Sequence, residues 1–258
     1  MKCLLAILAI DRDADLAPLL INACLDSIEC AKEVQVDILV ITRETDILTR
    51  VAWSHVATVL CVPHYDIHAR HAIQHVAAAR NTALQMAHEY DAVWFVDTDV
   101  LPHSNTLSLL WKSEFAVVGA PYRVRWCGFP AVGIIHDTVQ SPLPTHCNSA
   151  DEGQITLNGI ASRLRIVDAT KTNGHVHAMG FGCTLIRKEA FHISCDALTV
   201  IAGDLNSEHR YFSGEDVGFF FRAFQQGLKV GVLPTHEVPH LYDRSYSQFL
   251  HGKTGIPK

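Results

Sequence analysis

The stretch VAAARNTALQMAHEYDAVWFVDTDVLP, residues 76–102, is the part of the sequence from which the fold can be predicted most directly. It starts inside a helical pattern that covers residues 66–90 and continues into the apolar run AVWFV at 92–96. A short, continuous apolar run is typical of a strand that is buried on both faces. Asp97-Thr98-Asp99 follows directly. The sequence therefore predicts an acidic pair at the carboxyl end of a buried strand.

The segments before this stretch alternate between strand and helix patterns. Residues 15–33 place Leu16, Leu20 and further apolar side chains on one face of a helix. Strands that alternate with helices predict an α/β fold with a mostly parallel central sheet flanked by helices. Ligands of such sheets bind beyond the carboxyl ends of the strands, where the acidic pair lies. The expected strands are at 3–10, 34–42 and 58–62.

The second half of the sequence has a different composition. Residues 123–174 are rich in Gly, Pro, Asn, Asp and Thr, which predicts a loop-rich β insert or hairpin lobe over the site. Residues 196–213 have only a loose pattern. A helix is expected from Ser213 to a stop at Gly227, because glycine readily adopts the conformation that ends a helix. The other expected elements are strands at 115–122, 175–188 and 229–234 and a short helix at 188–194.

The bulk composition narrows the class of protein. A chain of 258 residues with 48% hydrophobic residues can bury one large core. The formal net charge is −6 and there is no block of Lys or Arg, so the charge does not indicate an extended nucleic-acid footprint. The eight cysteines include no CxxC pair, which predicts buried, reduced thiols and a reducing compartment.

The N-terminal run MKCLLAILAI is predicted to be the first strand and not a signal peptide. It is short, lacks a small-residue cleavage site and runs straight into Asp11-Arg12-Asp13. No segment approaches the roughly 18–20 apolar residues that a membrane span needs. We therefore expect a cytoplasmic protein without a membrane span, built as a single domain over residues 1–258.

Asp97 and Asp99 can both turn toward one point if the chain bends after the strand. Carboxylate oxygens suit a hard divalent cation such as Mn²⁺ or Mg²⁺, which keeps open positions for a diphosphate. Such a metal would neutralise the charge that develops on a leaving nucleotide diphosphate. The alternative is a polar turn that caps the following helix. The buried strand before the pair favours the metal site.

A second acidic pair, Glu215-Asp216, opens the helix after Gly214. Acidic residues in a first helical turn complement the helix dipole and need no further function. Asp216 can also be a general base that deprotonates an acceptor hydroxyl, with Glu215 positioning the acceptor. Both interpretations can hold at once, because we expect a carboxylate at a helix N-terminus to stay ionised and therefore to be available as a base.

Three other features have two interpretations each. Gly180, at the start of a predicted strand, indicates either a bulge or the close approach of a sugar or diphosphate. Arg80, late in the long helix, is either an ordinary polar residue of that helix or a contact to the nucleotide diphosphate. Asp11 and Arg12 end the first strand, where a base or ribose would lie in a nucleotide-binding fold.

Most of the sixteen histidines are expected to be surface or satisfied core residues. His240, in THEVPHLY after the last predicted strand, is the candidate for a third metal ligand, and His236 is its rival. The spacing of the two histidines would also suit zinc on a helix. Pro234 and Pro239 argue against a helix there, which disfavours zinc.

With these motifs in this order, the sequence resembles GT-A glycosyltransferases, especially the family-2-like enzymes common in bacterial and phage genomes. The resemblance runs through nearly the whole chain, and the ordered set of motifs is more specific than D-x-D alone. It rests on LLAILAIDRD, on the Arg-Asn helix that leads into the D-x-D strand, and on the segments FAVVGAPYRVR, HAMGFGCTLIRKEAF and SGEDVGFFFRAFQQGLKVGV.

The resemblance implies a GT-A fold in which residues 1–102 form the nucleotide-sugar-binding half. Residues 103–258 would form the acceptor-side half, with the insert at 123–174. The second strand ends in Thr-Arg-Glu-Thr-Asp, where the family commonly has Asn-Ser-Thr-Asp. Either Glu44 or Asp46 is then expected to contact the nucleotide.

The resemblance also implies the roles of the site residues. Asp97, Thr98 and Asp99 would hold the metal and the donor diphosphate, and His240 would complete the metal site. Asp216 would be the catalytic base of an inverting, single-displacement transfer. The implied reaction moves a hexose from a UDP- or GDP-sugar to an acceptor hydroxyl.

The acceptor is left open between a glycan, a protein and a hydroxymethylated pyrimidine in DNA, as the occurrence of compact relatives in phages suggests. The acidic net charge argues mildly against DNA, because phosphate contacts need Lys or Arg. An aromatic residue among arginines could nevertheless stack on a base, although a solvated loop is the alternative. The residues concerned are Arg123, Arg125, Trp126, Arg163 and Arg165.

Two other functions compete with glycosyl transfer. A nucleotidyltransferase would need a Gly-rich, basic loop after the first strand, and IDRDADLAP has no glycine. A non-catalytic sugar-nucleotide binder is disfavoured by the intact Asp97, Asp99 and Asp216.

Overall fold

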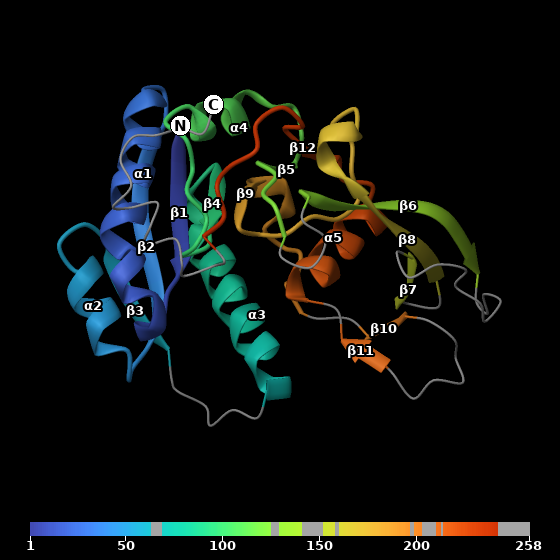
Figure 1. The fold of residues 1–258 in the computed structure, drawn as a ribbon, viewed down its shortest axis with the longest axis horizontal. Helices are drawn as coiled ribbons and strands as arrows, with labels where there is room; N and C mark the ends of the chain where they lie inside the picture. Colours follow the sequence, from blue (N-terminus) through green and yellow to red (C-terminus); the bar gives the residue numbers. More distant parts are fainter. Residues whose placement is uncertain are drawn as a thin grey trace.

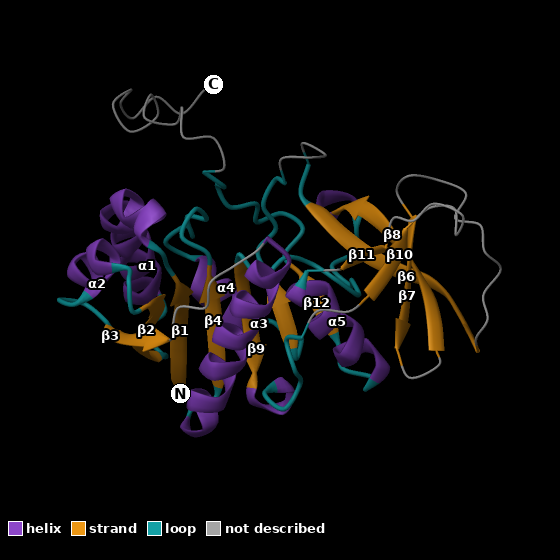
Figure 2. Ribbon diagram, turned by 90° about the horizontal axis from the view of Figure 1, so that it is seen from below, coloured by secondary structure: helices purple, strands orange, loops and turns teal. Residues whose placement is uncertain are grey.

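The computed structural model describes residues 1–62, 69–124, 129–140, 152–157, 160–196, 199–202, 210–212 and 214–241. Figure 1 shows two sheets, a large one that contains the first strand and a smaller one to its side. Helices lie against the large sheet (Figure 2). The predicted α/β class is confirmed.

The large sheet contains β1 (Lys2–Leu8), β2 (Gln35–Arg43), β3 (Thr58–Val62), β4 (Ala92–Val96), β5 (Val117–Gly119), β9 (Cys183–Arg187) and β12 (Val230–Val232). Their order is β12-β5-β9-β4-β1-β2-β3. β1 pairs in parallel with β2 and β4, β2 with β3, and β5 with β12. Among the described strands of this sheet, β9 alone is antiparallel to its neighbours. The expectation of a mostly parallel sheet is therefore confirmed.

Helices pack on both faces of the large sheet. They are α1 (Ala17–Cys30), α2 (Ile47–Trp53), α3 (Ala69–Met86), α4 (Thr106–Lys112) and α5 (Glu215–Gln225). Leu4 of β1 belongs to a buried cluster with residues of α3 and α5. Its neighbour Leu5 belongs to the cluster on the other face, with residues of α1, α2 and α4. Burial on both faces explains why the strands are continuous apolar runs.

Short 3₁₀ helices connect several of these elements. They are η1 (Asp11–Leu16), η2 (Ala87–Glu89), η3 (Ala169–Lys171) and η4 (Lys188–Ala190). η1 directly precedes α1, so that the helix expected at 15–33 begins as a 3₁₀ turn. η4 takes the place of the short helix expected at 188–194.

The smaller sheet contains β6 (Ala131–Gln140), β7 (Glu152–Leu157), β8 (Ile160–Asp168), β10 (Thr199–Ala202) and β11 (Arg210–Phe212). Its strands are antiparallel in the order β11-β10-β7-β8-β6. The β character of the insert at 123–174 is confirmed. The stretch 196–213, which has only a loose pattern in the sequence, adds two strands to the same sheet.

The structure departs from the expected elements in one strand and two short helices. The strand expected at 175–188 is confined to β9, and isolated bridges replace ladder pairing at His175 and Ala178. The helices α2 and α4 were not expected, because each has only seven residues, fewer than the roughly 11–18 in which a helical period can be recognised. The long helix expected at 66–90 is confirmed where the structure describes it, as α3 from Ala69 to Met86 followed by η2 to Glu89. Residues 66–68 lie outside the described residues.

Helix α5 starts and ends at glycines. Gly214 is its N-cap, and the expected cap Ser213 lies outside the described residues. At the other end Gly227 has φ +72°, and the Leu228 and Gly227 amides donate to the carbonyls of Ala223 and Phe224. This is a Schellman motif, so the predicted stop at Gly227 is confirmed.

Within the described ranges, no helix combines the length and the apolar character needed to cross a bilayer. The cysteines of the same ranges carry free thiols; the expected burial holds for four of them, whereas Cys30 is exposed and Cys61 is partly exposed. The cysteines concerned are Cys3, Cys24, Cys30, Cys61, Cys183 and Cys195.

Candidate functional site

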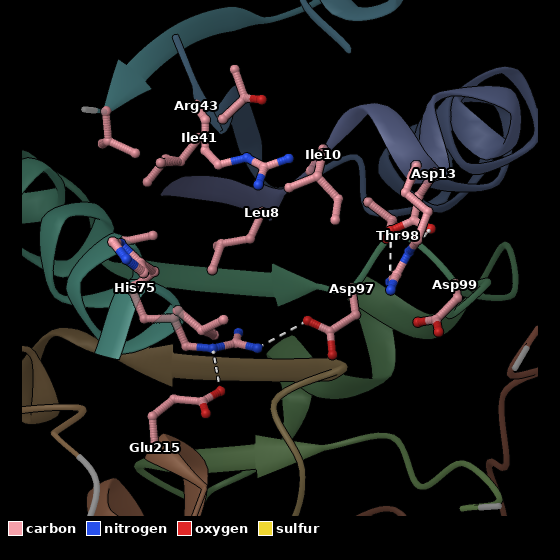
Figure 3. A pocket seen from close by; sticks show the side chains of 17 residues that line it. Leu8, Ile10, Asp13, Ile41, Arg43, His75, Asp97, Thr98, Asp99 and Glu215 are labelled. Atoms are coloured by element: carbon pink, nitrogen blue, oxygen red, sulfur yellow. Dashed lines mark hydrogen bonds and ion pairs between the residues drawn. The ribbon is translucent and has the colours of Figure 1, made fainter. Parts of the chain in front are cut away.

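A cavity of about 510 Å³ opens at the carboxyl ends of β1, β2 and β4, against α3 (Figure 3). This is where a ligand is expected in an open α/β sheet, and the volume is typical of small-molecule sites. Among the predicted site residues, the lining contains Arg12, Arg80, Asp97, Thr98, Asp99 and Glu215. The other lining residues are Leu8, Ala9, Ile10, Asp13, Ile41, Thr42, Arg43, Val62, His75, Val76 and Ala79.

Asp97 is fixed in place by its backbone and its side chain. Its amide donates to the carbonyl of Gly182 at 2.9 Å, which continues the pairing of β4 with β9. The amide of Val100 donates to the Asp97 carbonyl at 3.1 Å, so the chain turns at the acidic pair. Its carboxylate accepts a hydrogen bond of 3.0 Å from Nη2 of Arg80. The side chain therefore points into the cavity from the end of a buried strand (Figure 3).

Arg80 joins the acidic pair to helix α5. Its Nε donates to Oε1 of Glu215 at 3.1 Å, and its side chain is only 5% exposed. The guanidinium carbon lies 5.2 Å and 4.6 Å from the ring centres of Phe95 and Phe181. Burial works to lower the pKa of Arg80, but the charges of Asp97 and Glu215 raise it overall. Arg80 is thus a buried, permanently charged link between two carboxylates, and not a polar residue on the exposed surface of the helix.

The same guanidinium has bonding capacity left. Nη1 of Arg80 is buried and has no hydrogen-bond partner in the described part of the chain. A buried donor without a partner is costly, which favours a ligand oxygen as its missing partner. The contact with a donor diphosphate remains a prediction.

The segment after β12 brings His240 back to the acidic pair. The Leu241 amide donates to the carbonyl of Asp99 at 2.6 Å, and the Leu101 amide to that of Pro239 at 2.9 Å. Nε2 of His240 then lies 3.3 Å from Oδ2 of Asp99. Nδ1 lies 2.7 Å from the carbonyl oxygen of Arg123. Because a carbonyl only accepts, Nδ1 carries a proton. Nε2 faces the Asp99 carboxylate, to which it donates when the ring is doubly protonated, and its lone pair is available to a metal when the ring is neutral.

His236, the rival ligand, lies elsewhere. Its Nε2 is 2.8 Å from the hydroxyl of Thr106, and its ring packs against His103 at 5.4 Å. Burial and the neighbouring His103 lower its pKa. For His240, burial acts to lower the pKa, but the hydrogen bonds with Asp99 and Arg123 raise it overall. The structure therefore places His240, and not His236, against the acidic pair.

The chemistry of Asp97, Asp99 and His240 fits a divalent cation such as Mn²⁺ or Mg²⁺. Two carboxylates and an imidazole nitrogen of fixed tautomer are suitable ligands. They do not form a closed cage, since no group of three His, Cys, Asp or Glu side chains converges on one point within the described ranges. Mg²⁺ sites commonly use one or two carboxylates and take further ligands from substrate phosphates. An open site of this kind fits the position of the pair at the cavity.

Glu215 and Asp216 lie in the first turn of α5, but in different environments. Glu215 lines the cavity and is ion-paired with Arg80. Asp216 does not line it, and its Oδ1 accepts the amide of Val217 at 2.7 Å. Burial, and then the charge of Glu215, raise the pKa of Asp216 to about 7. The expectation that the helix terminus keeps Asp216 ionised was therefore wrong, because burial and Glu215 outweigh the helix end.

Asp11 and Asp46 are engaged inside the protein. Asp11 Oδ1 accepts the amide of Thr49 at 2.8 Å, in the first turn of α2. Asp46 is buried and accepts hydrogen bonds from the Thr42 hydroxyl, the Asp11 amide and the amide and guanidinium of Arg43. These bonds lower the pKa of Asp46 although burial opposes this. Neither residue lines the cavity, so their observed role is to join β1, β2 and α2.

Arg12 and Thr98 lie at the cavity wall near Asp13. The Arg12 side chain is 72% exposed and pairs with Asp13 at 3.0 Å. The Thr98 hydroxyl donates to the other oxygen of Asp13 at 3.3 Å. The sequence did not assign a role to Asp13, because an acidic residue in a short 3₁₀ turn carries no pattern of its own.

Gly180 makes room for a side chain of the protein itself. A Cβ atom there would lie 2.0 Å from the hydroxyl of Tyr122, and one at Gly182 would lie 2.7 Å from its ring. The Tyr122 hydroxyl accepts the Gly182 amide at 3.1 Å, and its ring packs edge-on against His240 at 5.0 Å. The glycines do allow another group to approach the backbone closely, as expected. That group is the Tyr122 side chain and not a sugar or diphosphate. Gly180 does not line the main cavity.

Asn81 and Arg123 make contacts that could not be predicted from the sequence. Asn81 accepts the amide of Cys195 at 2.8 Å and donates to Asp196 at 3.2 Å. The Arg123 guanidinium pairs with Glu237 at 2.7 Å, beside His240. Of the other residues considered for nucleic-acid contact, Arg125, Trp126 and the side chain of Arg163 lie outside the described residues, and Arg165 is exposed.

No protein-family model and no curated protein matches the sequence. The structure is similar to the mannosyltransferase PcManGT from Pyrobaculum calidifontis in complex with GDP-Man and Mn²⁺, with a TM-score of 0.55 and 12% identity over 94% of this chain. It also matches TarS of S. aureus in complex with UDP-GlcNAc, with a TM-score of 0.47 and 14% identity over 92% of this chain. The chain spans 57% of the PcManGT chain and 57% of residues 1–349 of TarS, the part of TarS in that structure. It has the GT-A fold of nucleotide-sugar transferases.

Proposed function

We propose that the protein is a metal-dependent glycosyltransferase that moves a hexose from a UDP- or GDP-sugar to an acceptor hydroxyl. The observation that carries this proposal is the cavity at the carboxyl edge of the sheet. It brings Asp97 and Asp99 of the β4 end together with Glu215 of α5, through the buried Arg80. The complex of PcManGT with GDP-Man and Mn²⁺ supports a donor and a cation of this kind.

Asp97, Asp99 and His240 would hold Mn²⁺ or Mg²⁺ together with the donor diphosphate. When bound, the metal would supply positive charge for the departing nucleoside diphosphate. The chain contributes the fixed Nδ1 proton of His240, which leaves Nε2 as ligand atom. Thr98 and Arg12 line the same wall and would contact the phosphates or ribose, and Nη1 of Arg80 would donate to a phosphate oxygen.

Asp216 is proposed as the general base of an inverting displacement. The acceptor oxygen forms a bond to the anomeric carbon while the bond from that carbon to the diphosphate oxygen breaks. The acceptor proton passes to Asp216 and the electron pair leaves with the diphosphate. A base with a pKa of about 7 suits this step, because catalytic pKa values near the operating pH are the most effective. Glu215, held by Arg80, would position the acceptor.

The acceptor is proposed to be a glycan, a protein or a hydroxymethylated base in DNA. We keep the proposed division into a nucleotide-sugar half, residues 1–102, and an acceptor half, residues 103–258. The antiparallel sheet formed by β6, β7, β8, β10 and β11 belongs to the second half, and β11 precedes α5, which carries Glu215 and Asp216.

One experiment tests the reaction class. Purified protein with Mn²⁺ is incubated with a panel of sugar nucleotides, and released nucleoside diphosphate is measured with and without acceptors. We expect release that depends on Mn²⁺ and is lost in Asp99→Ala. Release of pyrophosphate instead would identify a nucleotidyltransferase. Metal-dependent donor binding without any turnover would identify a sugar-nucleotide binder.

A second variant tests the division of roles. Asp216→Asn should lose turnover and keep the affinity for the donor, because Asp216 does not line the donor cavity. Normal turnover in this variant would show that the base is another residue.

A further inference from the structure

Arg43, the last residue of β2, lines the cavity and has no role in the reaction proposed above. Side chains of a strand alternate between its faces, so Leu39, Ile41 and Arg43 share one face. Leu39 and Ile41 belong to the buried cluster that contains Ala79 and Ala83 of α3. Arg43 therefore continues this row of side chains beyond the core, at the place where the cavity opens.

The guanidinium of Arg43 is held in one plane by Asp46. Nε and Nη2 donate to the two carboxylate oxygens at 2.7 Å and 2.6 Å, the geometry of a bidentate fork. The Asp46 side chain is 3% exposed and also accepts the Thr42 hydroxyl and the Asp11 amide. Because this carboxylate cannot turn away, the plane of the guanidinium is fixed as well.

The ion pair fixes one edge of Arg43 and leaves its flat face and its Nη1 group outside the pair. Asp46 balances its charge and occupies the Nε–Nη2 edge. The side chain is still 33% exposed, and Figure 3 shows it reaching over the cavity toward Leu8 and Ile10. A flat ring can stack on the guanidinium face without displacing Asp46.

The uncharged lining of the cavity is mostly apolar, and Figure 3 shows Leu8, Ile10 and Ile41 on the side of Arg43, apart from the acidic pair. We call this part, with Val62 and Val76, the apolar end. Thr42, His75 and Thr98 are the polar side chains of the uncharged lining. Arg43 follows β2 and Asp97 follows β4, with β1 between them, so two strand spacings of about 5 Å each separate these ends. A ligand whose diphosphate lies at Asp97 and Asp99 would place its remaining flat, uncharged part at the apolar end.

We propose that the nucleobase of the donor stacks on the guanidinium face of Arg43, against the apolar wall. This inference rests on the proposed function. Arg43 would add affinity for any base through its π-face, because every base presents a face that can stack.

The test compares nucleotides with nucleosides, so that base contacts are separated from phosphate contacts. Binding of UDP and GDP with Mn²⁺, and of uridine and guanosine alone, is measured for the unaltered protein, Arg43→Lys and Arg43→Gln. Lys keeps the positive charge beside Asp46 but has no planar group on which a base could stack. Gln has a planar amide group but no charge. Arg50→Lys, on α2 and outside the cavity lining, is the matched control and should bind all four ligands normally.

Stacking predicts that Arg43→Lys weakens nucleosides and nucleotides alike, by roughly tenfold, in the range measured for base stacking. Arg43→Gln should bind nucleosides more tightly than Arg43→Lys does. The melting temperature of each variant shows whether it is folded. If Arg43→Lys does not fold, the nucleoside affinity of a folded Arg43→Gln is compared with that of the unaltered protein instead.

Three results would overturn the proposal. Unchanged nucleoside affinity in both variants would exclude stacking, and losses confined to UDP and GDP would make Arg43 a phosphate ligand. In either case the proposed glycosyl transfer would stand. If UDP and GDP fail to bind the unaltered protein, the proposed function and the stacking are both wrong.

Discussion

Asp216 is the carboxyl group whose protonation should govern the rate. Its pKa is raised to about 7 by burial and by Glu215. A base must be deprotonated to accept a proton, so we expect kcat/KM to rise with pH, with a midpoint near 7, and then to level off. Asp216→Asn should be at least roughly 100-fold slower and lack this rise. Rates measured with saturating Mn²⁺ across the neutral range check this, and a profile that falls through neutral pH would contradict the role of base.

The same shift predicts a pH-dependent stability. The pKa of Asp216 is higher in the folded protein than its ordinary value of 3.8, so ionisation is harder in the fold than in the unfolded chain. The free-energy cost of ionising Asp216 in the folded protein is absent below about pH 4. It grows up to about pH 7 and has its full value above that pH. Asp216→Asn should therefore raise stability at alkaline pH, by about 1–2 kcal/mol for a half-buried group, and not in acid.

Urea unfolding at acidic and alkaline pH measures this difference. Asp26→Asn, on the exposed face of α1, is the control and should show no pH-dependent gain. An equal gain at both pH values would mean that the substitution acts through packing and not through the charge. A gain in stability together with lost turnover is the expected signature of a group kept for function.

Gly180 and Tyr122 should be energetically coupled. A Cβ at Gly180 would lie 2.0 Å from the Tyr122 hydroxyl oxygen and 3.0 Å from the ring carbon that carries it. Gly180→Ala should therefore destabilise the protein by about 1–3 kcal/mol, and clearly less in a Tyr122→Phe background. Unfolding free energies of the four proteins of this cycle measure the coupling. Additive effects would show that the hydroxyl is not the obstacle.

The residues of the site could be predicted where they stand next to a strong pattern. Asp97 and Asp99 follow a fully apolar strand, and Glu215 opens a helix with a clear stop, so their places in the cavity follow from the elements. Asp11 and Asp46 have the same residue type at similar strand ends. Their hydrogen bonds to α2 and to Arg43 depend on a helix that the sequence did not reveal, so their internal role could not be foreseen.

At the level of elements, the large sheet could be predicted better than the small one. Its parallel strands are buried on both faces by helices and are therefore long apolar runs, as in β1 and β4. The small sheet pairs β7 with β10, two strands separated by more than forty residues that include β9 of the other sheet. Pairing between distant segments leaves no local periodicity, so the loose pattern at 196–213 did not reveal β10 and β11.

A glycine in helix α5 should respond to substitution in the opposite way to that expected from helix propensity. Gly→Ala inside a helix usually stabilises by about 1 kcal/mol. At Gly218, however, the added Cβ would lie 2.1 Å from the carbonyl oxygen of Asp196. Arg222 donates to this oxygen and Asn81 donates to the Asp196 side chain, so the residue is held in place from both sides. We therefore expect Gly218→Ala to destabilise the protein and to lower kcat, because it displaces the turn that carries Glu215.

Gly227→Ala at the other end of α5 is the matched control. Gly227 has φ +72° with nothing within 4 Å of an added Cβ, so the cost should be about 1 kcal/mol of backbone strain. Its kcat should be unchanged. If Gly218→Ala proves stabilising, the contact of α5 with residue 196 is looser than described.

The whole molecule assembles the site from parts far apart in sequence. Arg80 comes from α3, Asp97 from the end of β4, Glu215 from α5 and His240 from the segment after β12. The sequence could supply the order of these motifs. Their convergence could not be derived from local pattern, because it depends on β9, which places the Gly182 carbonyl beside Asp97 and brings the second half of the chain to the first.

This convergence predicts that metal binding stabilises the entire protein. A ligand that binds only the folded state adds about 2.7 kcal/mol at a hundred times its dissociation constant. Mn²⁺ should therefore raise the melting temperature, Mn²⁺ with UDP should raise it further, and a chelator should reverse both shifts. In Asp99→Ala the shift should vanish, and in His240→Ala it should shrink, because Nε2 of His240 is held at that carboxylate. Asp26→Asn should keep the full shift. A shift that persists in Asp99→Ala and His240→Ala would place the cation elsewhere and remove the metal site from the proposed reaction.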